Sequence, residues 1–415
     1  MQNIKNVAVI GLGYIGLPTA AILAANGLSV VGVDVKESSV EAINRGEVPF
    51  VEPDLGAHVA GAVSLGTLKA TTDTPVSDAY IVAVPTPFQA DKSADLSYID
   101  AAARGIAPQL TGGELIILES TSPPGATKHL GKYLISLRPD LSLDPKSGKP
   151  VIHLAHCPER VLPGRVMVEL VTNDRIVGGL TRQAAEMARD LYSVFCQGEI
   201  HITDATTAEM AKLVENSYRD VNIAFANELS VISSKLGIDV WELIELANHH
   251  PRVNILQPGP GVGGHCIAVD PWFIVASAPE EAQLIRQARE TNDAKPGWVI
   301  NQVQQLVAAN PAATIAALGL AFKANIDDLR ESPAISIVQK LSAQLPSTAI
   351  TVAEPHITAL PAVLAGLQNV ALSPTETAVA EADIVLLLVD HDSFKTMDRA
   401  ALAGKHVVDT RGIWR

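Results

Sequence analysis

The segment VAVIGLGYIG, residues 7–16, decides the fold of the first part of the chain. A short apolar run leads into a GxGxxG pattern, and an apolar helical stretch begins near Pro18. In this order the glycines allow a tight turn and a close approach to a pyrophosphate, which the N–H groups and dipole of the following helix stabilise. The pattern therefore predicts a dinucleotide site formed by Gly11, Gly13, Tyr14, Ile15 and Gly16.

The acidic residue that closes the next apolar run, SVVGVD (29–34), indicates which dinucleotide binds. A carboxylate at Asp34 can accept hydrogen bonds from a ribose diol and repels a 2′-phosphate, so we expect NAD as the cofactor. The alternative is that the glycines only shape a turn between strand and helix. Thr86 and Thr121 follow two later strands, where a doubly wound sheet binds its ligand, and are candidates for contact with cofactor or substrate. Ordinary turn chemistry is the alternative for both.

Apolar runs alternate with helix-length segments in two parts of the chain, which predicts an α/β protein with two Rossmann-like, doubly wound domains. The runs are 7–11, 29–34, 79–84 and 114–120, and then 314–322, 349–354, 382–390 and 406–411. Between them, residues 206–236 contain no glycine or proline and repeat apolar residues at spacings of three and four. This spacing predicts one long helix, with Thr206 and Glu209 as a capping box and Gly237 as its stop.

We therefore expect three domains. Residues 1–203 form an NAD-binding Rossmann domain, 204–300 a helical connector that also forms a dimer interface, and 301–415 a second Rossmann-like domain. A length of 415 residues suits this organisation.

Composition and charge argue against several kinds of partner. A net charge of −14 argues against nucleic acid or an anionic membrane. No apolar run approaches the ~18 residues of a membrane span, and an early first strand leaves no room for a signal peptide. The three cysteines are widely spaced, so neither a disulfide framework nor a metal clip is indicated. We expect a reduced, cytoplasmic protein without a bound metal.

The loop PGPGVGGHC, residues 258–266, presents a thiol at Cys266. So many glycines let a backbone come close to a ligand. A nearby helix start at Asp270, read as an N-cap before Pro271, and a protonated His265 would lower the thiol pKa and favour a nucleophilic thiolate. The alternative for Cys266 is a small buried apolar residue.

Other polar residues in the chain suggest roles in chemistry. Lys212 and Asn216 are four apart on the long helix, so both could donate hydrogen bonds to an alkoxide or carbonyl oxygen and stabilise its charge as a hydride leaves the neighbouring carbon. The alternative is a solvated face that also carries Glu209. Glu159 in CPERVLPG is a possible general base, and Lys323 and Arg330 suit the phosphates of a second nucleotide. Neutralisation of these cations by Asp327, Asp328 and Glu331 is the alternative.

These motifs resemble the UDP-glucose/GDP-mannose dehydrogenase family along essentially the whole chain. The segments that carry the resemblance are GLGYIGLPTA, VPTP, ESTSPPG, PERVLPG, EMAKLVENSYRDVNIAFANEL, PGPGVGGHC and GLAFKANIDDLRESP. The resemblance implies oxidation of a sugar C6 hydroxyl to a carboxylate by two hydride transfers to NAD. It also implies that Cys266 carries a thiohemiacetal and then a thioester.

By the same resemblance, Lys212 and Asn216 hold the reacting oxygen, Thr121 and Asp270 position water, and Glu159 acts as acid or base. Arg330 lies near the NAD phosphates, and Arg252 reaches the substrate of the neighbouring subunit in a homodimer. The expected substrate-binding residues are Glu159, Arg160, Lys212, Asn216, Arg252, Gly263, His265, Lys323 and Arg411.

Three positions depart from the glucose-specific pattern of the family. This chain has Pro163 in place of a glutamate, Gln257 in place of a lysine and His265 in place of a serine. These departures argue against UDP-glucose as substrate. The segments CPERVLPGRVMVEL, HPRVNILQPGPGVGGHCIAVDPWFIVA and VVDTRGIWR resemble family members that act on UDP-N-acetyl-D-mannosamine, so we expect this substrate, with UDP-N-acetyl-D-glucosamine or another UDP-hexose as alternatives. A two-electron hydroxyacid dehydrogenase and a non-catalytic NAD-sensing scaffold are the alternatives outside this activity. The first lacks a cysteine loop and a second Rossmann-like domain, and the second leaves Cys266 without a purpose.

Overall fold

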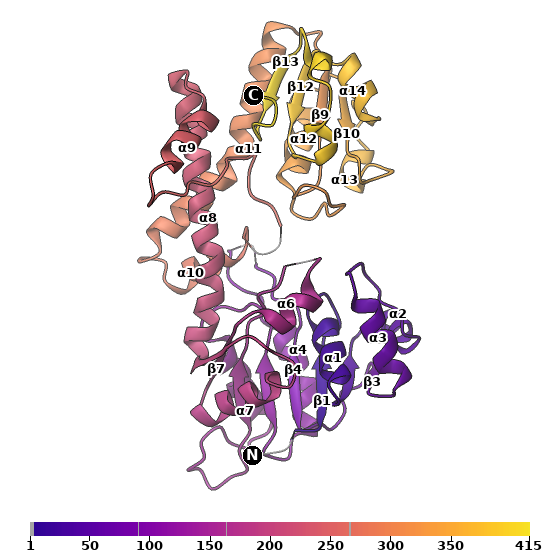
Figure 1. The fold of residues 1–415 in the computed structure, drawn as a ribbon. Coiled ribbons are helices and arrows are strands. Elements are labelled where there is room, and N and C mark those ends of the chain that lie inside the picture. The colour runs from indigo at the N-terminus through magenta and orange to yellow at the C-terminus, as the bar shows by residue number, and fades with distance from the viewer. Residues whose placement is uncertain (1–3, 90, 163, 265–266) are drawn as a thin grey trace. The chain divides into compact units, whose positions relative to one another are not determined.

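The computed structural model describes residues 4–89, 91–162, 164–264 and 267–415, and its chain divides into two compact units. One unit runs up to Val214 and the other from Glu215 to Arg415. Figure 1 shows that each unit is built around its own sheet. The three domain boundaries expected above remain a prediction.

The N-terminal unit is an eight-stranded sheet in the order β3-β2-β1-β4-β5-β6-β7-β8. Its strands are β1 (Asn6–Ile10), β2 (Ser29–Val33), β3 (Leu68–Thr71), β4 (Ala79–Val82), β5 (Leu115–Leu118), β6 (His153–His156), β7 (Arg175–Gly179) and β8 (Ile200–Asp204). The first six are parallel and follow the Rossmann order, as expected. β7 pairs antiparallel with β6, which departs from the parallel sheet that the sequence predicts.

Helices cover both faces of this sheet because its strands are apolar on both sides. Odd-numbered residues of β1, such as Val7 and Val9, pack in one core with α1, whereas Ala8 and Ile10 pack in a second core with α4 and α5. The helices are α1 (Gly16–Ala25), α2 (Glu37–Asn44), α3 (Leu55–Ser64), α4 (Ser97–Ile106), α5 (Ala126–Leu137), α6 (Val166–Thr172) and α7 (Arg182–Tyr192).

The expected long helix is α8 (Ala205–Leu236), and Gly237 ends it with a φ of +69°. Its start differs from the predicted capping box. Thr207 N donates to the Asp204 carboxylate (3.0 Å), so Asp204 takes the capping role expected of Thr206. The helices that follow are α9 (Val240–Asn248), α10 (Asp270–Ser277) and α11 (Gln283–Ala309), and α11 continues through Pro296.

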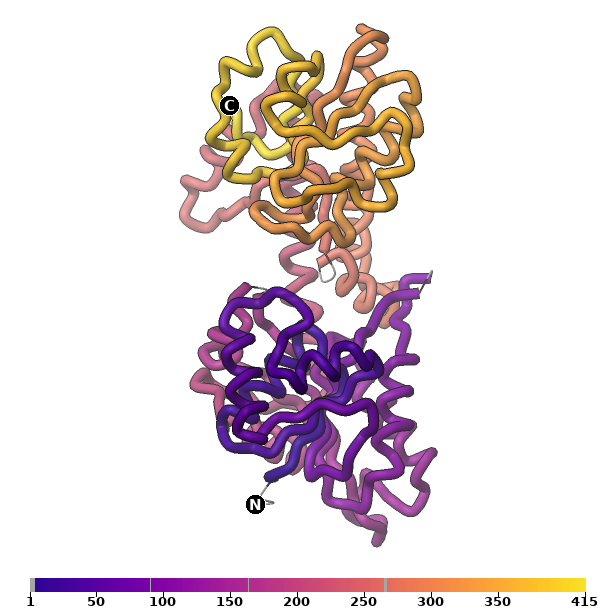
Figure 2. Tube along the Cα trace, turned by 90° about the vertical axis from the view of Figure 1, so that its right-hand side faces the viewer, coloured from indigo at the N-terminus to yellow at the C-terminus, as the bar shows by residue number. Residues whose placement is uncertain are grey.

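The second Rossmann-like sheet is five-stranded and parallel, in the order β11-β10-β9-β12-β13. Figure 2 follows its trace from orange to yellow. Its elements are β9 (Ile315–Leu318), α12 (Pro333–Gln344), β10 (Ile350–Ala353), α13 (Ala362–Ala365), β11 (Val370–Leu372), α14 (Thr375–Glu381), β12 (Ile384–Leu387), α15 (Asp392–Lys395) and β13 (His406–Asp409). The prediction of two doubly wound sheets joined by a long helix is confirmed.

Candidate active site

The three glycines after β1 differ in what surrounds them. Gly11 has a φ of +93°, and a Cβ there would lie 2.7 Å from the Ala83 carbonyl oxygen. A Cβ on Gly16 would lie 1.8 Å from the Gly11 carbonyl oxygen. Gly13 is open, because a Cβ there would meet no heavy atom within 4 Å. The turn therefore needs Gly11 and Gly16 for its own packing, whereas Gly13 leaves space beside the start of α1 for a pyrophosphate.

Asp34 lies at the end of β2, beside this turn. Its carboxylate accepts hydrogen bonds from Leu12 N and Lys36 N, both at 2.9 Å. The VPTP and ESTSPPG loops are joined, because the Ser120 hydroxyl donates to the Val84 carbonyl. The buried Thr86 hydroxyl has no hydrogen-bond partner among the described residues. An open cradle and an orphaned hydroxyl at the carboxyl ends of the strands fit the NAD that the sequence predicts.

Two glycine substitutions should separate folding from cofactor binding. Gly16→Ala forces a clash with backbone and should leave little folded protein, at a cost of at least about 3 kcal/mol. Gly13→Ala meets no protein atom and should fold with an almost unchanged melting temperature. Its methyl group enters the cofactor space, so we expect the KM for NAD to rise by about tenfold or more. Thermal melts and NAD titrations check this, and an unchanged KM for Gly13→Ala would contradict the placement of the pyrophosphate.

Glu159 is held by a buried ion pair that the sequence does not predict. Its Oε2 lies 3.2 Å from Nη2 of Arg175, on β7, and both side chains are almost inaccessible. Arg160 N donates to the other Glu159 oxygen (2.7 Å), and its guanidinium donates to the Asp174 carbonyl. The predicted acid or base is thus held in one place by Arg175. Arg175 was missed because it enters from a strand that no motif marks.

A second buried acid, Glu119, follows β5 directly and precedes Thr121 by two residues. It accepts hydrogen bonds from the hydroxyls of Thr19 and Tyr192, both at 3.1 Å. Burial, and next the charge of Glu159, raises the pKa of Glu119 to about 8, although Arg175 opposes the shift. Glu119 therefore links α1 and α7 to the loop that carries Thr121.

On α8, the interpretation of Glu209, Lys212 and Asn216 as a solvated face is wrong. Glu209 and Asn216 are buried, and Lys212 is half-buried. The Glu209 carboxylate accepts from Gly125 N (2.6 Å) and Thr127 N (2.7 Å) at the start of α5. This engagement removes Glu209 from the predicted capping box, because those two N–H groups offer a charge-assisted pair.

Asn216 and Asp270, predicted to act on the same substrate, are in contact. The Asn216 amide donates to the Asp270 carboxylate at 2.5 Å, and both are buried. The expectation that Asp270 caps α10 is wrong, since the helix begins at Asp270 itself and Val269 is its N-cap. An acidic residue in the first turn still suits the helix dipole.

A buried polar network joins α8 to α11 and to the glycine loop. Arg289 is fully buried and pairs with Asp220, whose pKa burial raises to about 6. Arg289 also donates to the Ile267 carbonyl (3.3 Å). Asn227 accepts from Gly259 N at 2.9 Å and donates to Asn292. Both the entry and the exit of the loop are therefore anchored from helices.

The glycines of this loop meet protein atoms, so the packing of the fold itself requires them, and their expected approach to a ligand stays a prediction. A Cβ on Gly259 would lie 2.7 Å from the Arg411 guanidinium, and one on Gly261 3.0 Å from Pro296 and Pro333. A Cβ on Gly263 would lie 2.6 Å from the Glu331 carbonyl oxygen. His265 and Cys266 lie outside the described residues, so their predicted roles stay predictions.

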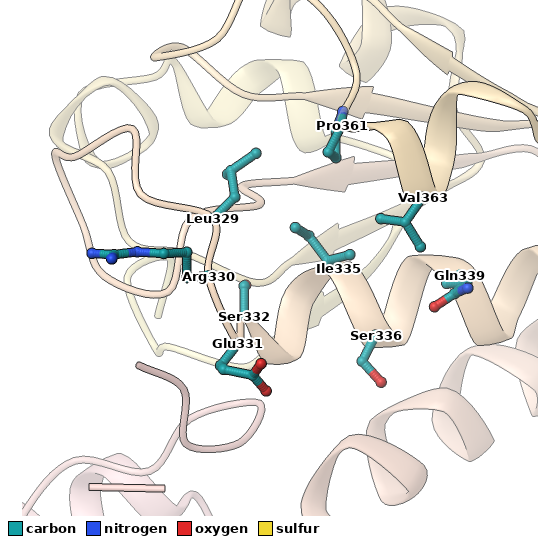
Figure 3. A pocket seen from close by; sticks show the side chains of 9 residues that line it. All are labelled: Leu329, Arg330, Glu331, Ser332, Ile335, Ser336, Gln339, Pro361 and Val363. Carbon is teal, nitrogen blue, oxygen red and sulfur yellow. The ribbon is translucent and has the colours of Figure 1, made fainter. Parts of the chain in front are cut away.

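The expected cations of the C-terminal unit differ in their partners. Arg330 forms a bidentate pair with Asp328 (2.6 and 2.9 Å), the alternative that the sequence left open. A cavity of about 380 Å³ adjoins it, and in Figure 3 the Arg330 side chain extends away from its apolar lining. Arg411 donates to Asp390 (2.8 Å). Lys323 and Arg252 are exposed, and neither forms an ion pair with another described residue.

Comparison with known proteins identifies the family. Three domain models of the UDP-glucose/GDP-mannose dehydrogenase family match: the NAD binding domain over residues 5–196, the central domain over 206–294 and the UDP binding domain over 316–415. The chain belongs to this family. It is an NAD-dependent UDP-sugar dehydrogenase, and the expected cofactor and family are confirmed.

Individual relatives extend the likeness over the full length of the chain. An NDP-N-acetyl-D-galactosaminuronic acid dehydrogenase from Ralstonia nicotianae is 57% identical over 99% of this chain and 97% of its own. A UDP-N-acetyl-D-mannosamine dehydrogenase from Salmonella typhi is 55% identical over 100% of both. The solved UDP-D-ManNAc dehydrogenase of Pyrococcus horikoshii superposes with a TM-score of 0.86 at 38% identity, over 99% of this chain and 96% of that one. Among the described residues, no helix is long and apolar enough to cross a membrane.

Proposed function

We propose that this dehydrogenase oxidises the C6 hydroxyl of UDP-N-acetyl-D-mannosamine to a carboxylate with two equivalents of NAD. The full-length likeness to UDP-N-acetyl-D-mannosamine dehydrogenases supports the substrate. The contact between Asn216 and Asp270 supports a reaction that ends in hydrolysis. It brings the residue expected to stabilise the oxygen at C6 next to the residue expected to position water.

The first half of the proposed reaction converts the alcohol to an aldehyde. NAD, held by the turn at Gly13 and by Asp34, would supply the hydride acceptor for C6 in each half. The ammonium of Lys212 and the amide of Asn216 donate hydrogen bonds to the oxygen at C6, which stabilises its negative charge as the hydride leaves. Glu159, held by Arg175, accepts the hydroxyl proton through water or directly.

The second half requires the thiol. The Cys266 thiolate adds to the aldehyde carbon, and the thiohemiacetal loses its hydride to become a thioester. Water, positioned by Asp270 and Thr121, then cleaves the C–S bond and restores the thiolate. Alcohol, water and two NAD thus give one carboxylate, two NADH and three protons.

A second candidate substrate is UDP-N-acetyl-D-galactosamine. The relative from Ralstonia nicotianae favours it, because its name refers to a galactosaminuronic acid and its identity of 57% slightly exceeds that of the mannosamine enzymes. Both candidates carry an acetamido group at C2 and differ from each other in the configuration at C2 and C4. We expect His265 to contact the acetamido group at C2.

A substrate panel tests the proposal. With UDP-N-acetylmannosamine we expect two NADH per uronate released. Its kcat/KM should exceed that of the glucosamine, galactosamine and glucose analogues by about tenfold or more, the range that one misplaced polar group produces. Absorbance at the NADH band and chromatography of the acid give both numbers. A single NADH per product would rule out the four-electron reaction, and a preference for UDP-N-acetylgalactosamine would establish the second candidate instead.

We also propose a cytoplasmic homodimer that forms through α8. Tyr218, Phe225, Ile232 and Leu236 are 69%, 52%, 44% and 64% exposed. Their spacings of seven and four residues place them on one stripe of the helix, an apolar face that a second copy would cover. The exposed Arg252 is then available to the partner's substrate.

A further inference from the structure

The N-terminal unit shows how a Rossmann frame uses the acid at the end of its second strand. Gly11, with a φ of +93°, donates from its N–H to the Val33 carbonyl at 2.8 Å. The next N–H, of Leu12, donates to the Asp34 carboxylate at 2.9 Å. The carboxylate is only half-buried, so it remains accessible to a ribose.

The C-terminal unit repeats this frame. Gly319 also has a φ of +93°, and its N–H donates to the Ala353 carbonyl at 2.8 Å. The next N–H, of Leu320, donates to the Glu354 carboxylate at 2.7 Å. Glu354 is therefore the counterpart of Asp34 in the second sheet.

The two acids differ in what else they bind. Glu354 is only 5% exposed, and its Oε2 also accepts from Ala321 N (3.1 Å) and lies 3.0 Å from His391 Nε2. Its Oε1 accepts from His356 N at 3.1 Å. These four contacts leave Glu354 closed to a ribose, so this acid no longer performs the task of Asp34.

His391 is fully buried, and its hydrogen bonds fix the ring. Its Nδ1 accepts from Asn325 N at 2.9 Å, which places the ring proton on Nε2, where it donates to Glu354. Glu354, His356 and His391 offer atoms within 4.8 Å of one another, close enough for a metal. Both nitrogens of His391 are occupied, however, so the group is a hydrogen-bonded latch.

The latch holds one loop at two points. Glu354 binds the N–H groups of Leu320 and Ala321, and His391 binds that of Asn325. Asn325, at a φ of +63°, is further tied to Asp392 by two hydrogen bonds of 2.9 and 3.0 Å. The exposed Lys323 lies between the two points.

We propose that Glu354 and His391 are positioning residues that hold Lys323 ready for the diphosphate of the nucleotide sugar. The inference rests on the proposed function and on the sequence-based expectation that Lys323 binds the phosphates of the nucleotide sugar. In the second Rossmann-like sheet, Glu354 occupies the position at which Asp34 is expected to bind a ribose, but it supports the loop that carries Lys323.

The test measures UDP binding to the full-length protein by calorimetry and the KM for NAD by kinetics. His391→Asn keeps an acceptor for Asn325 N but loses the bond to Glu354, and His391→Gln does the reverse. We expect each variant to weaken UDP binding by about tenfold, because one hydrogen bond that anchors the loop is lost and the loop becomes less ordered. The KM for NAD should not change. His356→Ala is the matched control, because its backbone N–H still reaches Glu354, and it should bind UDP as the wild type does.

A double-mutant cycle with Lys323→Ala separates positioning from general damage. If His391 acts through Lys323, His391→Asn should add little to the loss already caused by Lys323→Ala. Should the His391 variants not fold, Asp392→Ala removes the exposed clasp on Asn325 and should weaken UDP binding in the same way. Unchanged affinity in folded variants, or full additivity with Lys323→Ala, would overturn the proposal. Absence of UDP binding by the wild type would instead refute the proposed function.

Discussion

Replacing Cys266 with alanine is expected to abolish uronate formation while NAD still binds normally. Without the thiol, oxidation can proceed to the aldehyde only, because no covalent adduct is available for the second hydride transfer. We expect net acid production to fall by a factor of at least about 10³, the scale seen when a covalent nucleophile is removed. One NADH per aldehyde trapped would accompany this loss.

Serine at the same position gives a sharper signature. The hydroxyl of Cys266→Ser can form an ester, but an oxygen ester hydrolyses far more slowly than a thioester. We expect a burst of two NADH per active site, followed by slow turnover, and a mass increase on the protein. Cys196→Ser is the matched control, since Cys196 is half-buried outside the glycine loop and should keep full activity. Full turnover by Cys266→Ala would rule out the covalent mechanism.

Arg289→Met should lower the free energy of unfolding by about 3 to 5 kcal/mol. The variant leaves the Asp220 carboxylate buried without its cation and removes the donor to the Ile267 carbonyl. The pKa of Asp220 is already raised by burial and should rise further without Arg289. A raised pKa for an acid means that stability is lost as pH rises, so the variant should suffer more at pH 8 than at pH 5.

Urea denaturation at the two pH values measures the effect. Arg286→Met, on the same helix, is the matched control. Among the described residues the Arg286 guanidinium donates to the surface carbonyl of Pro279 at 2.9 Å, so the substitution should cost less than about 1 kcal/mol. The double variant Asp220→Leu, Arg289→Met should regain much of the stability, since it leaves no unpaired charge. Equal losses in the single and double variants would show that the ion pair is not the cause.

Local signals explain which features were predictable from the sequence. The cofactor turn and Asp34 depend on residues that are close in the chain, and the long helix ends at Gly237 as its spacing indicates. The pairs Arg175–Glu159, Arg289–Asp220 and Glu354–His391 join separate elements of the fold. A single sequence contains no periodicity that links such partners, so these contacts became visible only in the folded chain.

The glycine loop shows a different limit. Its composition predicts a close approach of backbone to a ligand, and the structure adds that Gly259 and Gly263 make space for protein atoms. Both causes demand the same residue, so composition alone does not separate them. The same holds for Asp270, whose position before Pro271 resembles a cap although its side chain binds Asn216.

Two glutamates at the starts of α5 and α6 affect where a phosphate can bind in the N-terminal unit. Glu209 binds Gly125 N and Thr127 N, and Glu52 binds Gly164 N and Val166 N (both 2.9 Å). Each carboxylate neutralises a helix terminus that would otherwise attract phosphate, whereas α1 begins without a side-chain cap. The protein thus supplies its own anions at the starts of α5 and α6 and none at the start of α1, where the dinucleotide is expected.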